Sequence, residues 1–149
     1  MVYAFKQGAQ IKANPQIAGE MCERLAEEGR LTARDLVEEN RPETAPLHSA
    51  FEWNDDIAAE NWREQQARHI IACLITRDEK KEPVRCFFNI VRSEPTYRHI
   101  DSILQSVDDT QRLLQTALSE LQAFERKYSK LQELAQVFEA IELAVAQNQ

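Results

Sequence analysis

The residues with the clearest potential chemistry are basic and amide side chains in the middle of the chain. Within PLHSAFEWNDDIAAENWREQQARHII, residues 46–71, the spacing of Arg63, Gln66 and Arg68 places them on the outward side of a predicted helix. Arginine can donate two hydrogen bonds to guanine, and glutamine can pair with adenine, so these three residues are candidate DNA contacts. The turn RDEKKEP that follows supplies three candidate phosphate contacts: Arg77, Lys80 and Lys81.

The charge distribution bears on this interpretation. A net charge of −7 disfavours a nucleic-acid partner for the chain as a whole. Residues 63–98, however, carry 8 basic and 5 acidic side chains, whereas residues 1–62 carry 6 and 12, and residues 99–149 carry 4 and 8. The one basic segment therefore coincides with the candidate contacts. A solvated helix face followed by an ordinary charged turn explains the same residues equally simply.

Metal binding and catalysis have weaker support. His69 and Cys73 are spaced to share a helix face, as zinc ligands do, and His48 lies earlier in the chain, but further ligands at motif spacing are missing. No GxSxG, HExxH, P-loop or GxGxxG pattern occurs. The odd number and wide spacing of the cysteines, which include Cys22 and Cys86, favour buried reduced thiols. We therefore predict a non-enzymatic protein that uses no metal and no cofactor.

Two helices are predicted in the first part of the chain. Asn14 and Pro15 form a strong helix start, because asparagine accepts from a free backbone N–H and proline gives up a donor that has no partner there. Gly29 is expected to end this helix. Thr32 begins a capping-box-like TARD sequence, which predicts a shorter helix at residues 33–39.

A third helix is predicted to begin at Asn54, followed by two carboxylates near the positive end of the helix dipole. Its core side is expected to contain Ile57, Ala58, Trp62, Ile70 and Cys73. Its outward side is expected to contain Arg63, Gln66, Ala67 and Arg68.

Segments rich in branched and aromatic residues follow at residues 71–76 and 84–91, and predict a β-hairpin. Residues 2–12 suit a strand or an extended arm. Three helices followed by a hairpin is the order of elements in winged-helix domains, in which the third helix enters the major groove. We therefore predict a mainly α, α+β chain whose residues 1–95 form a winged-helix-like domain, with an unusually long connection between the second and third helices.

The C-terminal part, residues 96–149, is predicted to be an oligomerisation segment. Ser106 caps a long run of helix formers, and apolar residues recur at intervals of three or four, close to the repeat of about 3.5 residues in coiled coils. One long helix and a helical hairpin both remain open. The residues expected to associate subunits include Leu114, Leu118, Leu121, Tyr128, Leu131 and Phe138.

Three segments carry a resemblance that spans most of residues 1–142: LTARDLVEEN, PLHSAFEWNDDIAAENWREQQAR and the late segment that contains ERKYSKL. They resemble a family of small, mostly uncharacterised proteins encoded by bacteriophages and prophages. The resemblance transfers no catalytic residue. It implies an accessory protein in a bacterial cytoplasm that acts on phage or host DNA or on a host protein.

We therefore expect a cytoplasmic homo-oligomer that binds DNA through several copies of a weakly basic surface. No apolar run approaches the roughly 20 residues that would cross a bilayer, so no membrane partner is expected. One alternative is a protein-interaction module, such as a regulator or anti-defence factor that binds a host or phage protein through acidic surfaces. Another is a structural subunit of a larger assembly.

Overall fold

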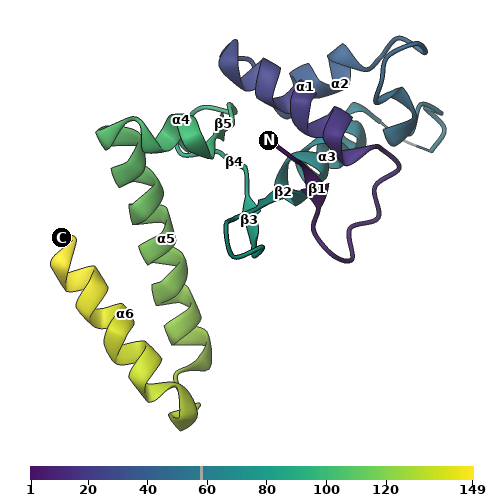
Figure 1. The fold of residues 1–149 in the computed structure, drawn as a ribbon. Helices are drawn as coiled ribbons and strands as arrows, with labels where there is room; N and C mark the ends of the chain where they lie inside the picture. The colour runs from purple at the N-terminus through teal and green to yellow at the C-terminus, as the bar shows by residue number, and fades with distance from the viewer. Residues whose placement is uncertain (58) are drawn as a thin grey trace. The chain divides into compact units, whose positions relative to one another are not determined.

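The computed structural model describes residues 1–57 and 59–149, which divide into two compact units, Met1–Ser102 and Ile103–Gln149 (Figure 1). The described residues form helices and a few short strands, so the predicted mixed and mainly helical composition is confirmed. The two units are called unit 1 and unit 2 below.

Unit 1 combines helices with two small sheets. Its elements in chain order are β1 (Ala4–Phe5), α1 (Pro15–Glu27), α2 (Ala33–Glu39), the 3-10 helix η1 (His48–Ala50), α3 (Glu60–Cys73), β2 (Leu74–Arg77), β3 (Pro83–Arg85), β4 (Phe87–Phe88) and β5 (Arg98–His99). Helix α4 (Ile100–Leu104) spans the division between the units.

The ends of α1 and the start of α2 form as the sequence predicts. Asn14 Oδ1 accepts hydrogen bonds from the N–H groups of Gln16 and Ile17, at 2.8 and 3.1 Å. Gly29 has a φ of 71°, which lets the following N–H bond back to the carbonyl of Leu25 at 2.8 Å and closes the helix end. At the start of α2, the side chain of the N-cap accepts from Asp35 N at 2.9 Å.

The predicted hairpin is present as β2 and β3, which pair antiparallel with Thr76 opposite Val84. Strand β1 pairs with the other edge of β2, so the sheet order is β1-β2-β3. The strand prediction for residues 71–76 starts too early, because α3 continues to Cys73 and β2 begins directly after it. The segment predicted as the second strand divides, since β4 leaves β3 and pairs with β5.

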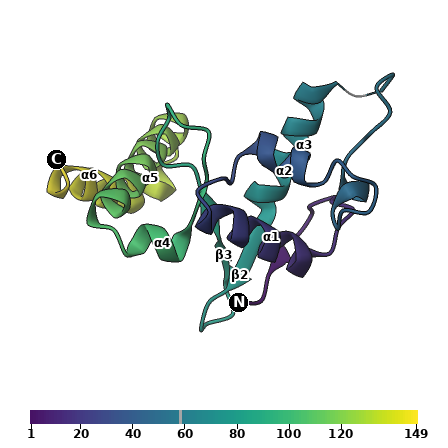
Figure 2. The same ribbon diagram turned by 90° about the horizontal axis from the view of Figure 1, so that it is seen from above.

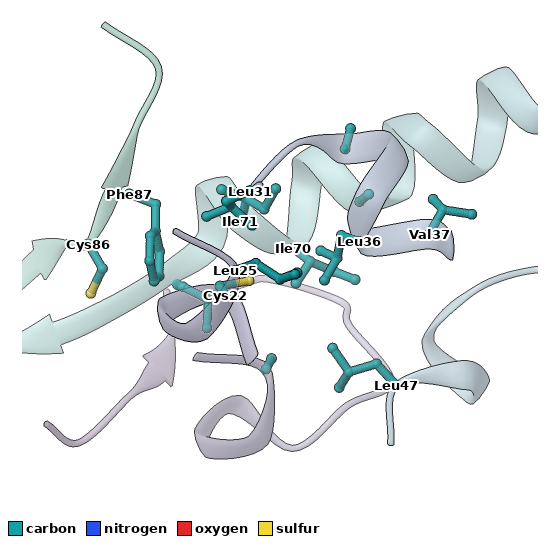
Figure 3. Close-up of a cluster of buried hydrophobic side chains, with 14 of the residues drawn as sticks. Cys22, Leu25, Leu31, Leu36, Val37, Leu47, Ile70, Ile71, Cys86 and Phe87 are labelled. Atoms are coloured by element: carbon teal, nitrogen blue, oxygen red, sulfur yellow. The ribbon is translucent and has the colours of Figure 1, made fainter. Parts of the chain in front are cut away.

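The core of unit 1 lies where α1, α2, α3 and the strands meet (Figures 2 and 3). Tyr3, just before β1, is buried under α1, and its ring stacks on Phe87 at a centroid distance of 6.2 Å. Tyr3 Oη donates to Glu23 at 2.5 Å and lies 3.3 Å from Nε2 of His99. Other buried side chains, all labelled in Figure 3, include Cys22, Leu25, Leu31, Leu36, Leu47, Ile70 and Ile71.

Unit 2 is a helical hairpin. Helix α5 (Val107–Tyr128) is followed by the 3-10 helix η2 (Gln132–Leu134) and by α6 (Ala135–Gln147), which packs along α5 (Figure 1). Ser106 caps α5, as predicted, by accepting from Asp109 N at 3.2 Å. Of the two arrangements left open by the sequence, the structure therefore has the hairpin. None of the described helices is long and apolar enough to span a membrane.

Candidate nucleic-acid interface

Helix α3, the predicted source of base contacts, begins at Glu60 and not at Asn54. The Asn54 side chain caps a turn instead: its Oδ1 accepts from Asp56 N at 3.0 Å, and its carbonyl accepts from Ile57 N at 2.9 Å. The residue at the actual N-cap, Ala59, has no side chain that can accept. The helix-start signal at Asn54 was therefore a turn signal.

The buried face of α3 also differs from the prediction. Ile57 and Trp62 were expected in the core, but they are 69% and 50% exposed. Ala58, expected beside them, lies outside the described residues. Arg63 and Ala67 were expected to face outward, and both are buried. The buried stripe, which includes the correctly predicted Ile70 and Cys73, consists of Arg63, Ala67, Ile70, Ile71 and Cys73.

Arg63 can occupy this buried position because unit 1 satisfies its guanidinium group. Nε donates to the carbonyl of Glu52 at 2.9 Å, Nη1 donates to Glu60 at 2.7 Å, and Nη2 donates to Asp55. The hydrogen bond that Arg63 donates to the Asp55 carboxylate is the main cause of the raised pKa of Arg63. The guanidinium carbon of Arg63 also lies over the Trp53 ring, 5.0 Å from the ring centroid. Arg63 is thus engaged inside unit 1, and contact with DNA would require these bonds to break.

Trp53 organises the segment between α2 and α3. Its ring stacks on His48, with centroids 4.8 Å apart and an interplanar angle of 3°. Its Nε1 donates to the carbonyl of His48 at 2.6 Å. The guanidinium of Arg41 lies over the same ring at 5.4 Å, and Arg41 also bonds Glu38 and Glu60. Histidine and tryptophan in this stretch therefore stabilise a loop.

Asn40, which is fully buried, anchors the same loop to α2. Its Oδ1 accepts from Leu47 N at 3.0 Å, its Nδ2 donates to the carbonyl of Leu36 at 2.8 Å, and its own carbonyl lies 3.0 Å from His48 Nδ1. Gln66 of α3 holds the far end by accepting from Glu52 N at 3.2 Å. These hydrogen bonds hold residues 40–52 against α2 and α3, and the side-chain oxygen of Gln66 is used in one of them.

The turn between β2 and β3 carries the remaining predicted phosphate contacts, and all of them are exposed: Arg77, Lys80 and Lys81. Asp78 Oδ1 accepts from the N–H groups of Lys80 and Glu82, each at 2.9 Å, which fixes the turn. Lys81 adopts a φ of 61°, and its carbonyl accepts from Arg77 Nη1 at 3.1 Å. Asp78 is thereby directed at backbone donors, while the lysine ammonium groups extend into solvent.

Arg68 is exposed on α3 and lines an open cavity of about 620 Å³ in unit 1. The cavity lies between the start of α2, the middle of α3 and the segment before β5, and it includes two further arginines, Arg34 and Arg92. None of the turn cations lines it. The structure thus divides the predicted basic surface into the β2–β3 turn and an arginine-lined cavity.

Arg34 and Arg92 were missed in the sequence because no spacing rule joins them to Arg68. The sequence indicates only that these arginines are charged and therefore expected at the surface, which is true of most arginines. Their proximity depends on a hydrogen bond from Tyr97 N to the carbonyl of Leu31 at 2.7 Å, which brings the segment before β5 to the start of α2. Such a contact is set by tertiary packing.

The cysteines and histidines have structural surroundings. The cysteines are buried and free, as predicted. Burial raises the pKa of Cys22 to about 12 and that of Cys86 to about 11, so neither thiol is activated as a nucleophile. His69 Nδ1 lies 3.5 Å from Cys73 Sγ, in agreement with their spacing. Within residues 1–57 and 59–149, no three His, Cys, Asp or Glu side chains gather as a metal site.

Unit 2 leaves much of its apolar surface uncovered. Leu118 and Ile141 are buried between the helices, and Phe124 contacts the rings of Tyr128 and Phe138 at centroid distances of 4.9 and 6.4 Å. Of the predicted association residues, Leu114, Tyr128 and Phe138 are half-buried, while Leu121 and Leu131 are exposed. The exposed large apolar side chains of the hairpin are Val107, Leu121, Phe124, Leu131, Val137 and Leu143.

No protein-family model matches this chain, and neither a curated protein nor a solved structure is significantly similar to it.

Proposed function

We propose that this chain is a non-enzymatic accessory protein of phage type that self-associates through unit 2 and binds DNA through exposed cations of unit 1, in a bacterial cytoplasm. The observation that carries the proposal is the uncovered apolar surface of the helical hairpin. DNA binding then arises because association places several weakly basic surfaces on one duplex, where their contacts act together.

Self-association follows from the packing of only two helices. Each helix covers one side of the other, and the side chains of Leu121, Val137 and Leu143 remain 41%, 45% and 60% exposed. Exposed apolar side chains on both helices of a two-helix unit favour an interaction site there. A second copy of the same hairpin supplies a matching surface, and the product is a four-helix bundle, a common stable arrangement of helices.

The DNA-binding part of the proposal uses the cations that unit 1 leaves exposed, Arg68 on α3 and the three in the β2–β3 turn. A winged-helix-like arrangement is supported by the order α1, α2, α3, β2, β3 and by the packing of α2 on α3. Arg63 is not part of this surface, because it is buried. Each copy of unit 1 offers few cations, so a single chain is expected to bind DNA weakly and an oligomer more strongly.

The experiment is sedimentation velocity of the full chain, alone and with a labelled mixed-sequence duplex, at low and physiological salt. We expect a dimer or larger species that carries the duplex at low salt. Affinity should fall with salt with a log–log slope of about −0.9 for each phosphate contacted. Leu121→Glu combined with Val137→Glu should give a monomer and weaken duplex binding by about 10²-fold or more.

A matched control for this variant is Ser119→Glu combined with Gln136→Glu, which adds the same charge at exposed positions of the same helices. It should remain associated. A native chain that stays monomeric at every concentration would contradict the association step. Duplex binding that ignores salt, or that survives Arg68→Glu combined with Lys80→Glu and Lys81→Glu, would contradict the DNA step.

A second candidate function, the binding of a host or phage protein, is favoured by a different surface. Ile57 and Trp62 are exposed near the start of α3, in a segment that also carries the exposed carboxylates of Asp55, Asp56 and Glu60. An exposed aromatic side chain among acidic groups suits a basic protein partner. If the duplex is not bound, a pull-down with the native chain and with Trp62→Ser tests this alternative.

A further inference from the structure

The cavity lined by Arg34, Arg68 and Arg92 combines guanidinium groups with a less polar side. The three arginines come from α2, from α3 and from the segment before β5. Ala33, Pro95 and Tyr97 supply apolar surface to the same lining, and Thr32, Asn89 and Ser93 supply hydroxyl and amide groups. Its volume of about 620 Å³ lies within the range of about 300–1,000 Å³ found for small-molecule sites.

The positive charge of this cavity is only partly balanced. Glu64 lies between two of the arginines, 3.8 Å from Arg34 Nε and 3.6 Å from Arg68 Nη2. The other acidic side chain of the lining, Glu94, pairs with Arg98 at 3.9 Å. Two arginines therefore share one carboxylate. Arg92 has neither an ion pair nor a hydrogen bond in the part of the chain that the structure describes.

The ion pairs to Glu64 are loose enough for a ligand to replace them. At 3.6 and 3.8 Å they are longer than hydrogen bonds, and pairs of this kind on a solvated surface contribute little. A phosphate group, in contrast, can accept two parallel and shorter hydrogen bonds from one guanidinium group. Three guanidinium groups, two of which share a single carboxylate, suit the double negative charge of a phosphate monoester better than the single charge of a carboxylate.

The segment that carries Arg92 is held in place. Glu94 N donates to the carbonyl of Val91 at 3.0 Å, and Asn89 Nδ2 donates to the carbonyl of Glu94 at 2.7 Å, so residues 89–94 form a closed turn. Tyr97 N fixes the end of this segment to the residues just before α2, by donating to the carbonyl of Leu31. The backbone on both sides of the cavity is thus ordered before a ligand arrives, which lowers the cost of binding.

We infer that this cavity binds one nucleotide, with the phosphate at Arg34, Arg68 and Arg92 and the base against the apolar side formed by Ala33, Pro95 and Tyr97. Aromatic and apolar side chains accept bases by stacking with little dependence on sequence. The nucleotide comes either from solution or from a single-stranded segment of nucleic acid. The inference deepens the proposed function, and it rests on that function only for the second source.

Two probes separate these sources. Thymidine 5′-monophosphate is titrated into the full chain by calorimetry, and a fluorescein-labelled oligothymidylate of about 12 nucleotides is titrated by anisotropy. The test variant is Arg34→Ser with Arg92→Ser. The control is Lys6→Ser with Lys12→Ser, which removes the same charge from exposed positions of unit 1 that belong neither to the cavity nor to the β2–β3 turn. All four side chains are exposed, so the helical circular dichroism of both variants should match that of the native chain.

We expect the test variant to lose affinity by about tenfold or more for each arginine removed, and the control to keep at least most of its affinity. Binding of the monophosphate with this pattern supports a free nucleotide as the ligand. Binding of the oligonucleotide alone with this pattern supports a strand. Failure of both probes at millimolar concentration, or equal loss in the two variants, overturns the inference.

The inference and the proposed function fail separately. Duplex binding that persists in Arg34→Ser with Arg92→Ser, without monophosphate or oligonucleotide binding, leaves the proposed function standing and removes the cavity assignment. Monophosphate binding that depends on these arginines, in a chain that retains no duplex, does the opposite.

Discussion

Replacing Gly19 by alanine should destabilise unit 1, although helix propensity alone predicts the reverse. Gly19 lies inside α1, where alanine is normally favoured over glycine by about 1 kcal/mol. The ring of Tyr3, however, lies directly against the Gly19 backbone. An added Cβ would overlap Cγ and Cδ2 of this ring and lie only 2.6 Å from Cδ1. The ring must therefore move.

The cost depends on how far the Tyr3 ring moves. A small displacement into the surrounding core costs about 1–3 kcal/mol, as overpacking usually does. Expulsion of the ring forfeits burial worth about 3–5 kcal/mol, by analogy with the loss of other large aromatic side chains. The hydrogen bond to Glu23 at 2.5 Å would be lost as well. A small displacement does not relieve the overlap of the added Cβ with Cγ, so expulsion of the ring is expected. Subtraction of the propensity gain from its cost gives a net destabilisation of about 2–4 kcal/mol.

Urea unfolding followed by circular dichroism measures this change in the free energy of unfolding. The same substitution in a Tyr3→Ala background provides the decisive comparison, because the overlap is then absent and only propensity remains. There, Gly19→Ala should be neutral or stabilising by up to about 1 kcal/mol. An equal effect in both backgrounds would refute the steric argument, and so would a native-like stability of the single variant.

Two further predictions concern charged groups. Arg63→Met should lower the melting temperature, because the carbonyl of Glu52 and the carboxylate of Asp55 lose their donor. Arg68→Met, on the exposed side of the same helix, should change the melting temperature little. Similar shifts in the two variants would contradict the buried role of Arg63. In unit 2, burial and then the hydrogen bond and charge of Glu142 raise the pKa of Glu125. This group therefore contributes most to the stability of the hairpin below the ordinary glutamate pKa, and the contribution is lost as pH rises through the raised value. Glu142→Gln should therefore increase the melting temperature more at neutral than at mildly acidic pH, and the charge-matched Glu139→Gln should not show this dependence.

The sequence predicted the elements whose signals are local. The helix start at Asn14, the stop at Gly29 and the cap at Ser106 depend on side chains that bond to backbone groups a few residues away, and each forms as expected. The β2–β3 hairpin is similarly marked by a polar turn between apolar strands. Such features can be predicted because they need no knowledge of the rest of the fold.

The orientation of α3 could not be predicted in this way. Burial statistics favour tryptophan inside and arginine outside, yet Trp62 is exposed and Arg63 is buried. The reversal depends on carboxylates and a carbonyl supplied by residues 52–60, which the loop positions beside the helix. The sequence therefore predicted only some of the exposed basic residues. Arg68 and the turn cations are exposed, while the cavity arginines Arg34 and Arg92 meet only through tertiary contacts.

The position of Tyr3 has a consequence for synthesis on the ribosome. Its hydroxyl group lies beside His99, which follows it by 96 residues, and β1 pairs with β2. At roughly 5–20 residues per second, His99 is added to the chain about 5–20 s after Tyr3. During this interval the apolar face of α1 lacks much of its cover and is open to chaperones. Unit 1 therefore completes its fold late, shortly before the helical hairpin of unit 2 is synthesised.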